Sequence, residues 1–241
     1  MTVVASTDTE RPRCSWATSA PEYAAYHDDE WGVPLHGDNE MFERMSLEAF
    51  QSGLSWITIL RKREAFRAAF GRFDLATVAD FDESDADRLM ADAGIVRNRQ
   101  KIDAVLSNAR IALEVDGGLS ELLWSYAPEH HERPRTAADV PAVSPGSIAM
   151  AKGLKKRGFR FVGPTTAYAL MQATGMVDDH IATCWRATAS PDPTPPRRQQ
   201  ARSTITDGSA DHQRRSATGI PPDVGRCAPA APVLDDDTRQ R

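Results

Sequence analysis

The chain has 241 residues, of which 41% are hydrophobic and 26% charged, and its formal net charge is −5 at pH 7. This composition predicts a soluble globular protein, and the acidic balance argues against one that coats nucleic acid non-specifically, because that mode needs clustered basic residues. No apolar run approaches the roughly 18 residues of a membrane span, and the first residues lack the basic-then-apolar order of a signal peptide. We therefore expect a cytoplasmic protein.

Both ends of the chain have a composition typical of disorder. Residues 188–241 are rich in Pro, Ser, Thr, Arg and Gln and contain few large apolar side chains, and residues 1–12 are similar. Such segments cannot bury enough surface to offset the entropy lost on ordering. We expect one compact domain over residues 13–187, an ordinary domain size.

Within that domain the apolar residues recur at helical spacing nearly everywhere. The pattern predicts helices over 39–53, 55–70, 84–94, 99–115 and 147–158, and no run alternates as a strand would. Residues 127–144 are proline-rich and predict a long connection. Helix ends are expected at Gly53, Gly94, Gly158 and Gly175, and N-caps at Asp74 and Ser84. The predicted fold class is all-α.

The segment 154–175, "LKKRGFRFVGPTTAYALMQATG", predicts a helical hairpin. A basic helix stops at Gly158, and Gly163 opens a second helix with Pro164 at its first position, where proline is preferred. Turn glycines allow close backbone approach, and free N–H groups at a helix start favour an anion such as a DNA phosphate. The alternative is an ordinary helical hairpin with a solvated basic face. The flanking basic residues are Lys155, Lys156, Arg157 and Arg160.

The stretch 179–185, "DHIATCW", places His180 and Cys184 four residues apart, which on a helical turn would put them on one face. Together with Cys14 and His27 they make a Cys2His2 set, the complement that structural zinc uses. The alternatives are buried cysteines that act as small hydrophobic residues, or His27 as a catalytic base. The third cysteine, Cys227, lies in the C-terminal tail, and three scattered cysteines do not make a disulfide framework.

The first quarter of the chain is dense in aromatic residues. These either belong to the core or line a pocket for a flat ring. Glu48 lies in an apolar stretch eight residues before Trp56, where a carboxylate is rare unless it is paired or functional, although a lone glutamate on a helix is usually solvated. The aromatic residues in question are Trp16, Tyr23, Tyr26, Trp31 and Trp56.

Taken together, the motifs "RCSWA", "YHDDEWGVP", "LEAFQSGLSWITILRKRE", "DAGIVRNRQKI", "LKKRGFRFVG" and "DDHIATC" resemble the DNA-3-methyladenine glycosylase I family of the helix-hairpin-helix glycosylase superfamily. The resemblance runs from Arg13 to Trp185. It implies a structural zinc that joins the two ends of the domain through Cys14, His27, His180 and Cys184. It also implies that Glu48 is the catalytic residue and contacts the damaged base together with Tyr26 and Trp56. Trp16, in the same aromatic segment, is expected to bind the base as well.

The implied activity is excision of 3-methyladenine from double-stranded DNA by a monomeric enzyme that flips the base out of the helix. Leu54, in the loop 51–56, is a candidate wedge that fills the hole, or else a core residue. Strand-cutting members of the superfamily carry a lysine just after the second hairpin glycine, whereas Pro164 and Thr165 stand here, which predicts an enzyme without lyase activity. Asp178 lies near the place of the superfamily's catalytic aspartate, and either takes part in the chemistry or caps a turn. Hairpin contacts to DNA are expected from Gly158, Gly163, Lys155 and Arg160.

Two other classes compete with this hypothesis. One is a module that binds DNA backbone or damage through the hairpin and zinc without catalysis, which would not need Glu48, Tyr26 and Trp56 together. The other is a redox protein with a disulfide between Cys14 and Cys184, which would leave His27 and His180 unused.

Overall fold

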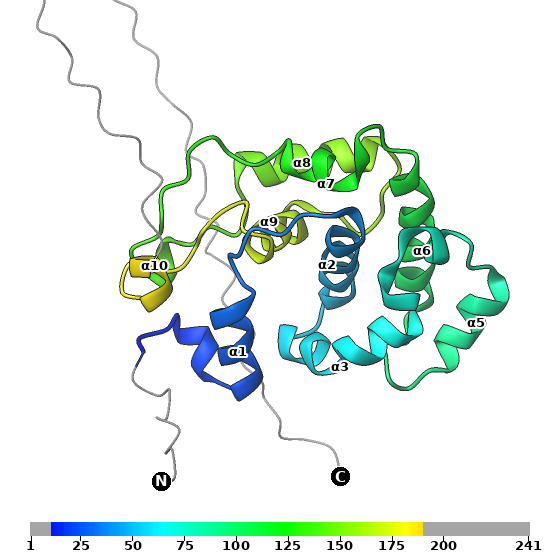
Figure 1. The fold of residues 1–241 in the computed structure, drawn as a ribbon, viewed down its shortest axis with the longest axis horizontal. Coiled ribbons are helices and arrows are strands. Elements are labelled where there is room, and N and C mark those ends of the chain that lie inside the picture. The colour runs from blue at the N-terminus through cyan, green and yellow to red at the C-terminus, as the bar shows by residue number, and fades with distance from the viewer. Residues whose placement is uncertain (1–10, 190–241) are drawn as a thin grey trace, which may run out of the picture.

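The computed structural model describes residues 11–189, and all its regular elements in that range are helical (Figure 1). The all-α prediction is thus confirmed. The segments expected to be disordered, and with them Cys227, fall almost entirely outside the described residues. No helix in the described range is long and apolar enough to cross a membrane. In chain order the elements are η2 (Ser15–Thr18), α1 (Pro21–Asp29), α2 (Asp38–Gln51), α3 (Trp56–Ala69), η3 (Gly71–Phe73), α4 (Leu75–Ala79), α5 (Glu83–Ala91), α6 (Arg99–Leu113), α7 (Gly118–Trp124), η4 (Ala137–Asp139), α8 (Pro145–Lys156), α9 (Pro164–Ala173) and α10 (Trp185–Ala189).

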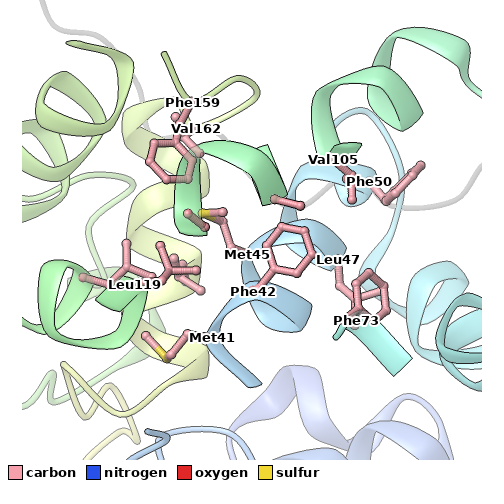
Figure 2. Packing of buried hydrophobic residues seen from close by; sticks show 14 of the residues in the cluster. Met41, Phe42, Met45, Leu47, Phe50, Phe73, Val105, Leu119, Phe159 and Val162 are labelled. Carbon is pink, nitrogen blue, oxygen red and sulfur yellow. The ribbon is translucent and has the colours of Figure 1, made fainter. Parts of the chain in front are cut away.

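Helix α2 lies at the centre of the molecule and packs against α3, α6, α7 and α9. All its residues from Met41 to Phe50 are buried except Glu43, so this helix is covered on nearly every side. Figure 2 shows its side chains in the main core, with Leu119 of α7 and Phe73 of η3 on either side of them in this view. A charged residue in this stretch is therefore held inside the protein.

Most of the expected helix boundaries agree with the structure. The five periodic segments correspond to α2, α3, α5, α6 and α8, and the N-cap Asp74 accepts a hydrogen bond from the Thr77 N–H. The expected cap at Ser84 is wrong: Asp82 caps α5 and exchanges hydrogen bonds with Asp85, because an aspartate two residues earlier satisfies the free N–H groups first. Gly94 does not adopt the positive φ of a helix-ending glycine, and α5 ends at Ala91.

Helices α8 and α9 form the expected hairpin. The chain leaves α8 at Gly158, whose φ of 95° is the left-handed conformation that glycine favours. Phe159 and Val162 of the turn are buried in the main core (Figure 2). The side-chain amide of Asn108, on α6, donates to the Arg160 carbonyl at 3.0 Å and accepts from its N–H at 2.9 Å. The turn is therefore fixed from inside, which leaves its outer face free for a partner.

The two ends of the described chain meet. The Trp185 N–H donates to the Pro12 carbonyl at 2.8 Å, and α10 lies near α1 in Figure 1. The segment after α1 is joined to the end of α9, because the Gly32 N–H donates to the Gln172 carbonyl at 3.0 Å. At this junction Gly175 has φ 71°, and an added Cβ would lie 2.6 Å from the Pro34 nitrogen, so only glycine fits there.

Candidate functional site

Where the chain ends meet, Cys14, His27 and Cys184 form a buried cluster. Their ligand atoms all lie within 4.8 Å of one another, and the His27 Nε2 is 3.4 Å from the Cys184 sulfur. Cys14 comes directly before η2, His27 lies on α1, and Cys184 comes directly before α10. Both thiols are free, so the structure contains no disulfide between them. Three of the four residues predicted as zinc ligands are therefore together.

His180, the fourth, lies beside this group without belonging to it. Its ring centroid is 4.8 Å from that of His27, and its Nε2 is buried without a hydrogen-bond partner in the described residues. The expected helical turn from His180 to Cys184 is wrong: this segment is irregular, and α10 starts only at Trp185. Asp178 explains the difference, since its carboxylate accepts hydrogen bonds from the His180 N–H at 3.2 Å and Nδ1 at 2.7 Å and so holds the backbone in a turn.

The environment of these residues fits a metal of the zinc type. Each histidine has its Nδ1 held by an aspartate, His27 by Asp28 at 2.8 Å and His180 by Asp178, which leaves each Nε2 with the lone pair that a metal ligand needs. Burial lowers the pKa of His27, which keeps its imidazole neutral as a ligand requires. Burial and the neighbouring Cys184 raise the pKa of the Cys14 thiol to about 12, a state that a bound cation would reverse by stabilising the thiolate. A buried imidazole nitrogen without a partner, on a ring 4.8 Å from that of His27, also fits a site for a metal.

A second group of predicted residues surrounds the buried end of α2. Glu48 is 5% exposed, and burial raises the pKa of its carboxyl group to about 7 against the lowering effect of Arg44. The pKa of a carboxyl group rises this far when the apolar surroundings disfavour its charge. Glu48 is therefore not the solvated helix residue of the alternative interpretation.

Aromatic rings lie next to this carboxylate. The Tyr26 ring on α1 lies 5.3 Å from that of Trp56, the first residue of α3, and 6.3 Å from that of Trp16. Tyr26 is buried, which together with nearby Glu48 raises the pKa of its phenol and keeps it neutral. The Trp56 Nε1–H is buried and has no partner among the described residues. The cluster thus combines aromatic faces, a buried carboxylate and an unused donor.

The loop between α2 and α3 lies beside this cluster. Leu54 is 42% exposed, so the alternative that it belongs to the core is wrong. Gly53 before it has φ 82°, which ends α2 sharply and turns the loop outward. On the hairpin, Lys155, Arg160 and Gly163 are all exposed, and a Cβ at Gly163 would meet nothing within 4 Å. The predicted DNA contacts are therefore all accessible.

A family model described as methyladenine glycosylase matches residues 16–187. The chain belongs to the methyladenine glycosylase family. The resemblance expected from the motifs is confirmed, and membership makes the protein a DNA glycosylase, a hydrolase of N-glycosyl bonds.

Relatives of this methyladenine glycosylase match over nearly their whole length. DNA-3-methyladenine glycosylase 1 of Escherichia coli K12 is 45% identical over 177 residues, which cover 71% of this chain and 95% of that protein. DNA-3-methyladenine glycosylase of Haemophilus influenzae is 42% identical over 178 residues, 71% of this chain and 96% of its own.

Solved structures agree with the fold. A crystal structure of 3-methyladenine DNA glycosylase I superposes with a TM-score of 0.70 at 44% identity and covers 72% of this chain and 98% of its own. A variant of such an enzyme in complex with 3-methyladenine gives 0.68 at 36% identity, over 71% of this chain and 95% of its own. The enzyme from Staphylococcus aureus gives 0.70 at 34% identity, over 76% and 98%.

The sequence did not point to two basic residues that support the candidate site. Arg44 is buried next to Glu48 on α2, and Lys101 of α6 donates to the carbonyls of Phe50 at 2.9 Å and Ser52 at 2.6 Å, which fixes the start of the Leu54 loop. A basic residue inside an apolar helical stretch is a usable signal for Arg44. For Lys101 the sequence offers none, because its partners are backbone carbonyls about fifty positions away.

Asp178 is engaged in holding other residues. It accepts the hydrogen bonds from His180 and one from the Arg133 Nη2 at 2.5 Å, and these partners lower the pKa of its carboxyl group despite burial. Between the two roles expected for it, the geometry matches the turn-capping one.

Proposed function

We propose that this protein excises 3-methyladenine from double-stranded DNA and that the cluster of Glu48, Tyr26, Trp56 and Trp16 receives the flipped base. The observation that carries the proposal is the buried carboxylate of Glu48 near the Tyr26 ring, which in turn packs against the Trp56 ring. Methylation at N3 makes adenine cationic, so a carboxylate and aromatic faces attract it, each by about 1 to 2 kcal/mol when desolvated. Relatives of the same family carry this activity in their names.

The reaction needs little acid catalysis from the protein. A cationic purine is already a good leaving group, so the enzyme needs to extrude the base, bind it, and leave room for water to attack C1′ of the sugar. Glu48 would act in its ionised form, in contact with the positive base. Since burial raises its pKa to about 7, base release should increase with pH through the neutral range.

A release assay tests this function directly. Purified protein is incubated with duplex DNA treated with a methylating agent, and the freed bases are separated by chromatography. We expect 3-methyladenine as the main product. DNA binding without any released base would favour the alternative, a zinc-containing module that binds DNA backbone or damage without catalysis.

We further propose that Cys14, His27, His180 and Cys184 bind one structural zinc per chain. The support is the cluster of three ligand atoms and the unpartnered His180 Nε2 beside it. When all four positions hold protein ligands no site is left for water, so the metal would stabilise the junction of the chain ends without entering the reaction. In a redox protein with a disulfide between Cys14 and Cys184, His27 and His180 would have no role.

The proposed enzyme does not cut the strand. Strand cleavage by this superfamily proceeds through a Schiff base on a lysine after the second hairpin glycine, and Pro164 begins α9 at that place. We expect that borohydride, added during turnover, traps no covalent adduct between protein and DNA, as judged on a denaturing gel. A trapped adduct would contradict the monofunctional mechanism, and a lyase-competent glycosylase in parallel shows that trapping works.

Backbone contacts would come from the hairpin, with Leu54 as the wedge that occupies the vacated space in the duplex. Replacing both Lys155 and Arg160 by alanine is expected to weaken binding to undamaged duplex and to reduce the slope of log K against log salt by about two, since each basic residue releases roughly one counterion. Fluorescence anisotropy across a salt series measures both. Arg88→Ala on α5, remote from the hairpin in Figure 1, is the control that should leave the slope unchanged.

A further inference from the structure

The buried cation Arg44 lies one helical turn before Glu48 on α2. Residues four apart share a helix face, and Arg44 is only 7% exposed. Burying a guanidinium is costly unless nearby negative groups compensate its charge. Its presence inside α2 therefore needs a partner of opposite charge.

Glu30 supplies only part of that compensation. The Arg44 Nη2 donates to the Glu30 Oε2 at 3.1 Å, but the same carboxylate accepts from both terminal nitrogens of Arg63, at 2.6 and 2.8 Å. Arg63 is thus the closer and bidentate partner of Glu30. The Arg44 Nη1 is buried and has no hydrogen-bond partner in residues 11–189. Arg44 and Arg63 bring two positive charges, whereas Glu30 brings one negative charge. Glu48 is the second negative charge that balances them.

Arg44 also contacts the aromatic part of the pocket. Its guanidinium carbon lies 5.5 Å from the centroid of the Tyr26 ring, within the range of a cation–π contact. We propose that Arg44 is a positioning residue of the base pocket: it provides the counter-charge for the Glu48 carboxylate and holds the Tyr26 ring in place. This inference rests on the proposed function, since it assumes that Glu48 acts as a carboxylate.

The role of Arg44 implies a pH dependence. Burial raises the pKa of Glu48 to about 7, and Arg44 is the group that opposes this rise. The other groups around Glu48 do not replace it. Tyr26 from α1 is neutral, Glu30 and Arg63 pair with each other, and Lys101 from α6 binds the carbonyls of Phe50 and Ser52. Without Arg44, Glu48 should ionise only at a higher pH.

The test is the pH profile of 3-methyladenine release from methylated duplex DNA by the Arg44→Met variant. We expect the acidic limb to move up by about one pH unit, which is about a tenfold loss of activity at pH 6 and nearly equal activity at pH 9. Arg44→Lys, which keeps the charge, should restore the midpoint. Arg44→Gln is a second neutral variant that can still donate to Glu30. It should show the same shift of the acidic limb, and it serves as the test if Arg44→Met folds poorly.

Arg63→Met is the matched control. It removes the other arginine that binds Glu30 but leaves the positive charge of Arg44 near Glu48 in place. It should lower the melting temperature without moving the midpoint. If Arg44→Met and Arg44→Gln keep the wild-type midpoint while Glu48→Gln is inactive, the role of Arg44 is wrong and the role of Glu48 stands. If Glu48→Gln is itself active, the proposed role of Glu48 fails, whatever Arg44 does.

Discussion

Glu48→Gln is expected to lower the rate of 3-methyladenine release by a factor of about 100 to 1,000, the range found when one buried electrostatic group is removed from an active site. Glutamine has nearly the same shape, so the pocket and its aromatic rings stay in place while the negative charge disappears. Single-turnover release from methylated duplex DNA measures the loss. DNA binding through the hairpin should remain within about twofold, because the substitution leaves the hairpin backbone and its basic residues unchanged.

Glu40→Gln is the matched control, since Glu40 lies on the same helix but is exposed. It should release base at the wild-type rate. Near-normal release by Glu48→Gln would show that the carboxylate has no part in excision.

Stability provides a second measurement on the Glu48→Gln variant. Because the folded pKa of Glu48 is raised from its ordinary 4.5 to about 7, the folded protein binds this proton more tightly than the unfolded chain. Its stability therefore falls as the pH rises from about 4.5 to 7, by up to about 3 kcal/mol for this one group. The variant lacks this cost, so its advantage over the wild type should grow from pH 4 to pH 8. A variant that is less active and more stable would show that Glu48 is kept for function.

Local patterns predicted the long helices because those helices carry their own signals. The apolar spacing of 39–53 is clear, and it corresponds to α2 with boundaries close to the expected ones. The short helices were not predicted, because packing specifies them more than periodicity does. Helix α7 has seven residues, its N-cap Gly117 has a left-handed φ of 79°, and the Ser120 N–H donates to Asp38 on α2. Such an element depends on a distant partner that sequence spacing does not contain.

In the candidate site, too, local sequence predicted some residues, whereas contacts between distant residues could not be predicted. Residue types and motifs identified Glu48, Tyr26, Trp56 and the cysteine and histidine set, since these are unusual where they stand. What could not be predicted is the supporting contacts, such as the pairing of Arg63 with Glu30 across 33 positions. The position of His180 outside the group of three also depends on the turn at Asp178, which overrode the helical spacing assumed for His180 and Cys184.

Cys184→Ala is expected to abolish zinc binding and to lower the melting temperature by 10 °C or more, on the order of the loss of a metal that ties both chain ends together. The wild type should contain about one zinc per chain by elemental analysis, and a strong chelator should destabilise it. The variant should contain none, and the chelator should leave its melting temperature unchanged, because no metal remains to remove. Cys227→Ala, in the segment outside the described residues, should behave as the wild type in both measurements.

Zinc retained by Cys184→Ala would remove the proposed site, whereas loss of zinc with an unchanged melting temperature would mean that the metal binds but does not hold the fold. Residual base release by the variant at low temperature would separate this structural role from the chemistry at Glu48, since a closed tetrahedral site leaves no position for the attacking water.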